Sequence, residues 1–263
     1  MAARKSILVF DSGLGGLTVY REVAAARTDA DFIYVADDAA FPYGSLEESM
    51  LVTRVVDLIG KLIEVNQPDL VVIACNTAST IVLPELRKKF ALPFVGTVPA
   101  IKPACAASVT RRVSVLGTDA TVKREYTRAL IRDYAQDCDV TLVGSTKLAA
   151  YAEAELHGAP ASDAAIGAEI GACFRDDGKR TDTIVLACTH YPLLIDRLRQ
   201  LAPWPVNFLD PAPAIARRVV GLLGAAPGSA ESGTTRAIFT SGRTPQKALD
   251  RFGIRPDELA AIR

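Results

Sequence analysis

Residues 71–77 read VVIACNT, and residues 184–190 read IVLACTH. Each stretch is a short apolar run that ends in Ala-Cys and then turns polar. Both runs consist of Val, Ile and Leu and lack the alternation of a strand with one wet face, which is typical of strands covered on both sides. The two stretches therefore predict a pair of buried strands that each carry a cysteine at the carboxyl end.

A second pair of matching stretches lies upstream of these two. Residues 7–13 read ILVFDSG and residues 113–119 read VSVLGTD, so each is a strand followed by a small hydroxyl-bearing segment. Ser12 precedes Cys75 by 63 residues, and Thr118 precedes Cys188 by 70 residues. We interpret this repeated pattern as two related α/β halves. The alternative is that the ends of unrelated strands share a composition by chance.

Apolar runs and amphipathic stretches alternate along the chain. Strands are predicted at 6–10, 32–35, 69–74, 113–116, 140–143, 183–187 and 236–240, the first six covered on both faces. Helices are predicted near 16–26, 120–134, 146–156, 163–175 and 213–223, and one from Ser45, where Ser45 and Glu48 form a capping box. Composition predicts a loop at 224–235. This alternation favours parallel α/β sheets, and 263 residues suffice for two domains.

Composition excludes several classes of function. The 30 basic and 30 acidic residues balance, so nothing in the net charge favours binding to nucleic acid or to an acidic membrane. The apolar run after the charged N-terminus is four residues long, too short for a secretion signal, and no segment approaches the length of a membrane span. We therefore expect a cytoplasmic protein.

The cysteines are the residues of greatest chemical interest. They number five, with no CxxC pair, which indicates reduced thiols, and with only two histidines in the chain a structural zinc site is not expected. Cys105, Cys138 and Cys173 belong to no constellation of polar residues and are interpreted as small apolar residues. Cys75 and Cys188 differ because each follows a matching strand.

Ligands of parallel sheets bind at the carboxyl ends of the strands. The predicted strand ends carry Asp11, Ser12, Cys75, Asn76, Thr118, Cys188, Thr189 and His190. If the two halves face each other, Cys75 and Cys188 approach a ligand from opposite sides. Inversion of a carbon stereocentre needs this arrangement, since one group removes a proton from one face and another returns a proton to the other face. A thiolate serves as the base and a thiol as the acid.

Three residues are candidate partners of the thiols. Asp11 ends the first strand, beside the strand of Cys75; its alternative role is a cap of the following helix. His190 lies two residues after Cys188 and can orient or protonate it. Glu153 belongs to the helical run LAAYAEAELHG, whose pattern alone predicts an exposed glutamate.

Other polar segments suit an amino acid zwitterion. The turn Gly13–Gly16 has neither the dinucleotide spacing nor a P-loop lysine, and we expect its N–H groups to face a ligand carboxylate. Asn76, Thr77 and Thr189 supply further donors and acceptors. The loop 37–45 contains Pro42, Tyr43 and Gly44 and is either a rigid turn beside the cleft or an ordinary surface turn.

The combination of these segments resembles the glutamate racemases of the aspartate/glutamate racemase superfamily. The matching stretches are FDSGLGGLTV (10–19), FPYG (41–44), ACNTAS (74–79), GTVPAIKPA (96–104), VLGTDATVK (115–123) and LACTHYPLL (186–194). The pair ACNTA and CTHYP is the most specific signal. The resemblance implies two flavodoxin-like, pseudo-symmetric α/β domains, residues 1–97 plus 209–263 and residues 98–208, with the active site in the cleft between them.

The resemblance also implies roles for individual residues. Cys75 matches the thiol that deprotonates the D-enantiomer, with Asp11 as its partner, and Cys188 matches the thiol that acts on the L-enantiomer, with His190 as its partner. Glu153 falls where the family has a further assisting carboxylate. Substrate-binding positions are Asp11, Ser12, Pro42, Tyr43, Gly44, Asn76, Thr77, Thr118, Thr121, Thr189 and His190.

Further expectations follow from the family. Its members use no pyridoxal phosphate, metal or nucleotide cofactor, and their product D-glutamate enters peptidoglycan synthesis. Some are activated by a peptidoglycan precursor and carry an N-terminal extension, which the ten residues before Asp11 argue against here. Aspartate-specific relatives usually place Glu after the second Cys-Thr, so His190 favours glutamate. A homodimer is left open.

Three alternatives remain at this point. The first keeps the fold and changes the substrate to aspartate, a hydantoin or a related compound. The second is a non-catalytic amino-acid-binding protein in which the cysteines are structural. The third is a thiol redox protein, which the separation of Cys75 and Cys188 disfavours.

Overall fold

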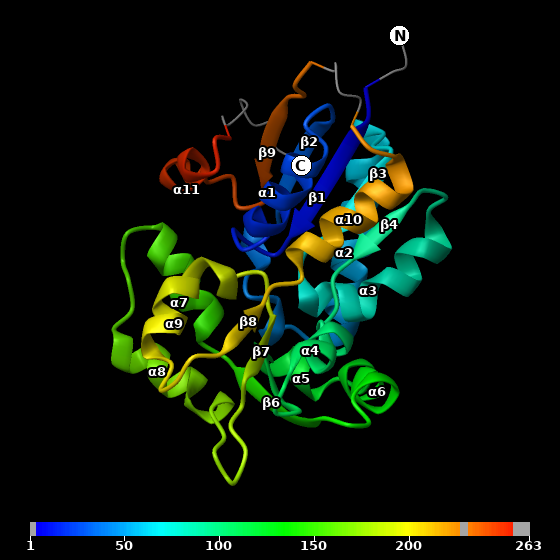
Figure 1. Ribbon diagram of the computed structural model, residues 1–263. Coiled ribbons are helices and arrows are strands. Elements are labelled where there is room, and N and C mark those ends of the chain that lie inside the picture. The colour runs from blue at the N-terminus through cyan, green and yellow to red at the C-terminus, as the bar shows by residue number, and fades with distance from the viewer. Residues whose placement is uncertain (1–3, 227–230, 255–263) are drawn as a thin grey trace. The chain divides into compact units, whose positions relative to one another are not determined.

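The computed structural model describes residues 4–226 and 231–254, and the chain divides into two compact α/β units (Figure 1). The first unit comprises Met1–Thr97 and Ala212–Arg263, and the second comprises Val98–Pro211. Both contain a parallel sheet, which confirms the predicted fold class. None of the helices in the described part of the chain combines the length and apolar character that a membrane crossing requires.

The sheet of the first unit has five parallel strands in the order β4-β3-β1-β2-β9. Its strands are β1 (Ser6–Asp11), β2 (Asp31–Ala36), β3 (Leu70–Ile73), β4 (Phe94–Gly96) and β9 (Thr235–Phe239). The central strands are almost wholly buried, as continuous apolar runs predict. The carboxyl ends of β1 and β3 lie next to each other, because Phe10 pairs with Ile73.

Helices cover this sheet. They are α1 (Leu17–Ala26), α2 (Glu48–Asn66), α3 (Asn76–Lys89), α10 (Ala212–Leu223) and α11 (Gln246–Arg251), with 3-10 turns η1 (Asp38–Ala40) and η2 (Tyr43–Ser45). The face of α2 that carries Leu51, Val55, Ile59 and Leu62 is buried with α3 against the sheet. The helices α1 and α10 pack against each other.

The second unit has a four-stranded parallel sheet in the order β6-β5-β7-β8. Its strands are β5 (Arg112–Thr118), β6 (Asp139–Ser145), β7 (Thr183–Ala187) and β8 (Asn207–Leu209). Its helices are α4 (Ile101–Ala107), α5 (Asp119–Lys123), α6 (Glu125–Tyr134), α7 (Leu148–Leu156), α8 (Asp163–Ile170) and α9 (Ile195–Leu201), with 3-10 turns η3 (Gly171–Cys173) and η4 (Tyr191–Leu194). Gly117 pairs with Ala187, so the ends of β5 and β7 are adjacent, as are those of β1 and β3.

The capping box at Ser45 is wrong. The Ser45 hydroxyl donates to the carbonyl of Pro42 and closes η2, and the helix begins only at Glu48, where the Glu47 side chain accepts the N–H of Ser49. The pattern failed because a serine also closes short turns by bonding to nearby backbone.

Other boundaries differ for local reasons. The helix predicted at 120–134 is two helices, since Arg124 is extended and interrupts it, and the helix at 163–175 ends as α-helix at Ile170. The strand at 140–143 is an edge strand and is only partly buried. The strands β4 and β8 were not predicted because three residues give no pattern, and α3, α4, α9 and α11 were also missed. Within the predicted loop 224–235, residues 227–230 lie outside the described part.

Candidate functional site

The first unit places Cys75 directly after β3, where it is the N-cap residue of α3. Its thiol is buried and donates to the hydroxyl of Ser12 across 3.7 Å. Ser12 follows β1, and the N–H of Ala74 bonds to the carbonyl of Phe10 at 2.8 Å, which extends the contact between the two strands to this point. The register of the parallel pair thus brings together two residues that are 63 positions apart.

Asp11 is the last residue of β1 and is fully buried. One oxygen of its carboxylate accepts the N–H groups of Gly13 and Gly16, at 3.1 and 3.0 Å. A Cβ atom at Gly16 would lie 2.4 Å from the Cβ of Asp11, so only glycine fits there. The expectation that the turn offers these N–H groups to a ligand is therefore wrong for Gly13 and Gly16, since both bind Asp11.

The first turn of α3 is buried rather than facing water. Asn76, Thr77 and Ser79 are all nearly inaccessible. Among the described residues, the Asn76 amide has no hydrogen-bond partner for its nitrogen or its oxygen. A buried polar group without a partner costs about 1–3 kcal/mol, so an amide of this kind is suited to a ligand that supplies the missing bonds.

The loop after β2 holds Tyr43 inside the unit. Its ring is buried in the apolar core with Cys75 and Phe10, and its hydroxyl donates to Asp37 at 2.6 Å. Pro42 and Gly44 on either side are half-buried. The interpretation as an ordinary surface turn is therefore wrong for Tyr43.

The second unit places Cys188 directly after β7, beside an imidazole and a carboxylate. The Cys188 sulfur lies 3.9 Å from Nδ1 of His190, and Nε2 of His190 lies 2.8 Å from a carboxylate oxygen of Glu153 on α7. The Thr189 hydroxyl lies 3.4 Å from the same Nδ1. Glu153 is only 15 % exposed, so the helical pattern that predicted an exposed glutamate is wrong at this position.

These neighbours set the charge of His190. Burial disfavours the charged imidazolium, but hydrogen bonds with Cys188 and Glu153 and the charge of Glu153 outweigh it, so the pKa of His190 is raised well above its usual value. Near neutral pH the ring is therefore protonated. A protonated ring donates from both nitrogens, to Cys188 on one side and to Glu153 on the other.

The threonines of the second unit gather at the start of α5. Thr118 ends β5 and caps α5, since its hydroxyl accepts the N–H of Thr121 at 3.1 Å. The two hydroxyls lie 2.9 Å apart. Because Gly117 pairs with Ala187, Thr118 and Cys188 are the next residues along their two strands.

The predicted site residues thus fall into two groups, one at the carboxyl edge of each sheet. The first unit collects Asp11, Ser12, Pro42, Tyr43, Gly44, Cys75, Asn76 and Thr77. The second collects Thr118, Thr121, Glu153, Cys188, Thr189 and His190. Each group has one thiol with a polar neighbour, so each can accept or give up a proton. In the described ranges, no cluster of His, Cys, Asp and Glu forms a metal-ligand set.

The remaining cysteines lack such surroundings. Burial raises the pKa of Cys173 to about 12. Burial, together with a hydrogen bond to Cys138, raises the pKa of Cys105 to about 12 as well. Both thiols therefore stay protonated near neutral pH, which suits their interpretation as apolar residues.

Sequence reasoning missed Asp37, the buried acceptor for Tyr43. Arg54 on α2 and Thr240 after β9 also donate to it. Its position directly after β2 was the available signal, because Ser12 and Cys188 also follow strands directly. Arg54 and Thr240 carry no such signal, since one is in mid-helix and the other 203 residues away.

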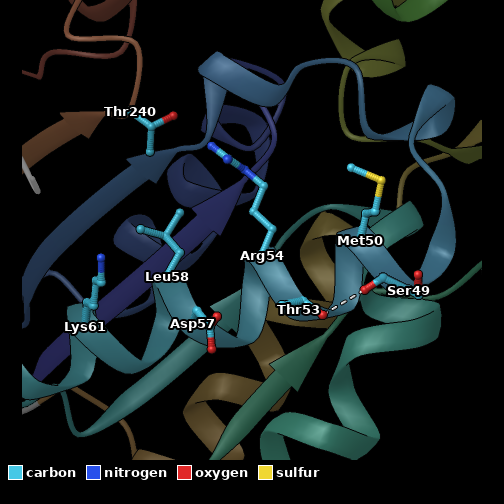
Figure 2. Close-up of a pocket in the computed structure, with 8 residues that line it drawn as sticks. All are labelled: Ser49, Met50, Thr53, Arg54, Asp57, Leu58, Lys61 and Thr240. Carbon is cyan, nitrogen blue, oxygen red and sulfur yellow. Dashed lines mark hydrogen bonds between the residues drawn. The ribbon is translucent and has the colours of Figure 1, made fainter.

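A surface hollow of about 620 Å³ lies over α2, beside the end of β9 (Figure 2). It is lined by Ser49, Met50, Thr53, Arg54, Asp57, Leu58, Lys61 and Thr240. None of the predicted site residues lines it, so this hollow is separate from both thiol groups.

Comparison with known proteins identifies the family. Residues 7–219 match the Asp/Glu/Hydantoin racemase family. A glutamate racemase of Brucella canis is 53 % identical over 97 % of this chain and 95 % of its own length. The crystal structure of Escherichia coli glutamate racemase with L-glutamate and the activator UDP-MurNAc-ala matches with a TM-score of 0.87, 40 % identity and 96 % coverage of both chains.

A more distant match concerns the fold alone. Allantoin racemase from Klebsiella pneumoniae is 19 % identical, with a TM-score of 0.53 over 84 % of this chain and 89 % of its own. The fold is therefore shared by racemases of different substrates. The family match covers most of the chain and includes both cysteine segments, and the chain belongs to the Asp/Glu/Hydantoin racemase family.

Proposed function

We propose that this chain interconverts L- and D-glutamate without a cofactor, with the thiols of Cys75 and Cys188 as its two acid/bases. The observation that carries the proposal is the pair of buried cysteines that end matching parallel strands, each with a different polar neighbour. The relatives with 53 % identity over nearly the full length are glutamate racemases, which supports glutamate as the substrate.

The chemistry requires two groups in opposite protonation states. One thiolate removes the α-proton, and a thiol on the other face returns a proton to the carbon. The Cys188 sulfur lies beside the protonated imidazole of His190, whereas the thiol of Cys75 donates to the neutral hydroxyl of Ser12. These surroundings suit Cys188 as the base toward L-glutamate and Cys75 as the base for the reverse direction, after its proton has been given up.

Asp11 and Glu153 assist in different ways. Asp11 ends the strand beside Cys75 and is oriented by two backbone N–H groups, so its carboxylate is suited to receive a proton from that thiol or from the ligand ammonium. Glu153 acts through His190, which it orients and keeps charged.

Substrate binding falls to the donors at the strand ends. The unpartnered amide of Asn76 and the N-terminal turn of α3 suit a carboxylate of glutamate, as do Thr77, Thr118, Thr121 and Thr189. Pro42, Tyr43, Gly44 and Ser12 complete the set. Both thiols must reach the same α-carbon, and the reaction needs a binding site that excludes water.

The biological role follows from the product. D-glutamate made in the cytoplasm supplies peptidoglycan synthesis. The Escherichia coli relative was crystallised with an activator, UDP-MurNAc-ala. The rate of the purified protein with and without such a compound tests whether the compound activates this chain.

The decisive experiment uses purified protein with each enantiomer of glutamate in deuterated water. Circular dichroism follows the loss of optical activity and NMR follows deuterium entry at the α-carbon. We expect racemisation that Cys75→Ser and Cys188→Ser each abolish. Parallel assays with aspartate and allantoin test the substrate. Binding without α-proton exchange would support a non-catalytic protein, and normal turnover by either variant would contradict the two-thiol mechanism.

A further inference from the structure

Ser145 is a buried serine at the carboxyl edge of the second sheet, and the two-thiol mechanism leaves it without a role. It is the last residue of β6 and pairs in register with Thr118, the last residue of β5. Its side-chain oxygen accepts the N–H of Lys147 at 3.2 Å and the N–H of Leu148 at 2.9 Å. Ser145 therefore attaches the start of α7 to the edge of the sheet, because N–H groups at a helix start have no partner within the helix.

The hydroxyl of Ser145 also holds a second helix. Its oxygen lies 2.6 Å from a carboxylate oxygen of Glu169 on α8. Backbone N–H groups cannot accept a hydrogen bond, so the hydroxyl donates its proton to Glu169 while it accepts from α7. The end of α8 is in turn attached to β5, because η3 follows it and the Ser114 hydroxyl donates to the carbonyl of Cys173 in η3 at 2.7 Å. One oxygen thus joins β6, the start of α7 and the end of α8, which lie together in the second unit (Figure 1).

The other restraints on α7 are weaker. Two of its four buried side chains are Ala149 and Ala152, which bury little apolar surface. Near its C-terminal end Glu155 pairs with Arg197 at 2.9 Å, but both side chains are partly exposed, and solvent weakens such a pair. The bonds to Ser145 are of the kind that contributes about 0.5–2 kcal/mol, so they are a main determinant of where α7 lies.

The bond between Glu153 and His190 depends on the position of α7. Glu153 lies five residues after Leu148, about 7.5 Å further along the helix axis. Its carboxylate reaches Nε2 of His190, which precedes η4 and belongs to a different part of the unit, at 2.8 Å. A hydrogen bond of this kind weakens once its two atoms lie more than about 3.2 Å apart, so a small displacement of α7 is enough to weaken it.

The groups that face His190 are few. Cys188 faces one nitrogen from the end of β7, and Glu153 faces the other from α7. The hydroxyl of Thr189 is a neutral neighbour. Tyr191 keeps its proton, because burial and the charge of Cys188 raise its pKa well above the usual value. Glu153 is therefore the carboxylate whose contact helps to keep the ring charged.

We propose that Ser145 is a positioning residue that, together with Glu169, fixes the start of α7 so that Glu153 on the same helix keeps its hydrogen bond to His190. This inference rests on the proposed function, in which Glu153 acts through His190. It assigns the end of β6 a part in the reaction although no atom of Ser145 touches a thiol or the imidazole in the contacts described above.

The test measures the ionisation of His190 by NMR. The chain has two histidines, and His157 is exposed at the C-cap of α7, so it is an internal reference. The variant His190→Asn assigns the two imidazole signals. We expect the titration midpoint of His190 to fall by about one pH unit or more in Glu153→Gln and by about half a pH unit or more in Ser145→Ala, while that of His157 stays nearly unchanged.

Combining the two substitutions tests whether they act through the same contact. In the double variant Ser145→Ala/Glu153→Gln we expect the midpoint of His190 to equal that of Glu153→Gln alone, because the contact that Ser145 supports is already lost. A further fall in the double variant would overturn the inference, since Ser145 would then act on the imidazole by another route.

Two substitutions of Glu169 separate its hydrogen bond from its charge. Glu169→Gln retains an acceptor oxygen for the Ser145 hydroxyl and should keep the midpoint of the wild-type protein. Glu169→Ala removes the acceptor and should lower the midpoint as Ser145→Ala does. If both variants lower it equally, the charge of Glu169 acts on His190 directly and the inference is overturned. This pair also decides the question if Ser145→Ala does not fold.

Ser162→Ala is the matched control for Ser145→Ala. Ser162 also caps a helix of the second unit, since its hydroxyl accepts the N–H of Ala165 at the start of α8 at 3.2 Å. The substitution should lower the melting temperature and leave the midpoint of His190 unchanged. If Ser145→Ala likewise lowers only the melting temperature, the serine stabilises the fold and positions nothing, which would overturn the inference.

Activity assays keep this inference distinguishable from the proposed function. In an active racemase, the alkaline limb of the kcat profile of Ser145→Ala should move to lower pH together with the NMR midpoint, because the ring then loses its proton at lower pH. A limb that stays in place while the midpoint falls would contradict the role of His190 in the proposed function. A wild-type protein that racemises neither enantiomer would refute the proposed function, and the NMR midpoints would still decide whether Ser145 positions Glu153.

Discussion

Cys75 and Cys188 occupy the same position in two similar parallel sheets, but their polar neighbours differ. Each follows a central parallel strand, and each is adjacent to the strand end that carries Ser12 or Thr118. Cys75 faces a neutral hydroxyl, whereas Cys188 faces an imidazole that a carboxylate holds protonated. The parallel strands thus decide where each thiol lies, and the neighbouring side chains decide which polar groups it meets.

The difference is useful for a reaction that runs in both directions. Two thiols with the same surroundings would favour the same state, and the reaction needs one base and one acid at a time. His190 and Glu153 place charged groups near one thiol, and Ser12 places a neutral hydroxyl near the other. Substitutions that remove this difference should therefore slow one proton transfer more than the other.

Among substitutions of the neighbours of the two thiols, the largest effect is expected for His190→Asn. It removes the cation beside Cys188, and we expect kcat to fall roughly 10²–10³-fold, within the range for loss of acid–base assistance. L- and D-glutamate are enantiomers, so the equilibrium constant is one and kcat/KM has to fall equally in both directions. The asymmetry appears in deuterium isotope effects, which should rise for α-deuterated L-glutamate and fall for α-deuterated D-glutamate.

The isotope effects decide the assignment of His190 to Cys188. A rise for the D-enantiomer instead would assign the histidine to the other proton transfer. Equal changes for both would mean that His190 supports the fold rather than one thiol, and a thermal melt of the variant checks that directly.

A smaller and pH-dependent effect is expected for Glu153→Gln. The amide keeps a hydrogen bond to His190 but lacks the charge that helps raise the pKa of the ring. His190 should then lose its proton at lower pH, so the alkaline limb of the kcat profile moves to lower pH and kcat near neutrality falls about tenfold. A profile that superimposes on that of the wild-type protein would contradict a role of Glu153 through His190.

The melting temperature of Glu153→Gln should depend on pH for the same reason. A group whose pKa is raised on folding stabilises the folded state fully below its unfolded pKa, about 6.5 for histidine, and this contribution is lost as pH rises through the folded pKa. The difference in melting temperature between wild-type protein and Glu153→Gln should therefore be larger at pH 6 than at alkaline pH. Glu155 lies on the same helix as Glu153 and bonds to Arg197. Glu155→Gln is therefore the matched control and should show no such trend.

The sequence predicts the strands that carry the site better than it predicts the side-chain contacts within the site. The apolar runs located Ser12, Cys75, Thr118 and Cys188 at the ends of strands, because the pattern of a buried strand is local in the sequence. The pair of His190 and Glu153 spans 37 residues, and the helical pattern around Glu153 argued for exposure. The contact of Asp37 with Thr240 spans 203 residues and had no pattern at all. Contacts of this kind depend on how helices and loops pack over the sheet, which periodicity does not encode.

The smallest effect is expected for Ser12→Ala, which changes the surroundings of Cys75 rather than those of Cys188. The substitution removes only a weak, neutral partner of the Cys75 thiol, worth about 0.5–1.5 kcal/mol at most, so kcat should fall about two- to tenfold. The isotope effect should now rise for α-deuterated D-glutamate, the mirror image of the result for His190→Asn.

Ser79→Ala is the matched control for Ser12→Ala. It also removes a buried serine hydroxyl from the first unit, but one that bonds to the backbone of Ile73 and Thr97. It should lower the melting temperature and leave both isotope effects unchanged. If Ser12→Ala behaves like this control, the hydroxyl does not set the state of Cys75, and Asp11 becomes the group that distinguishes the first thiol from the second.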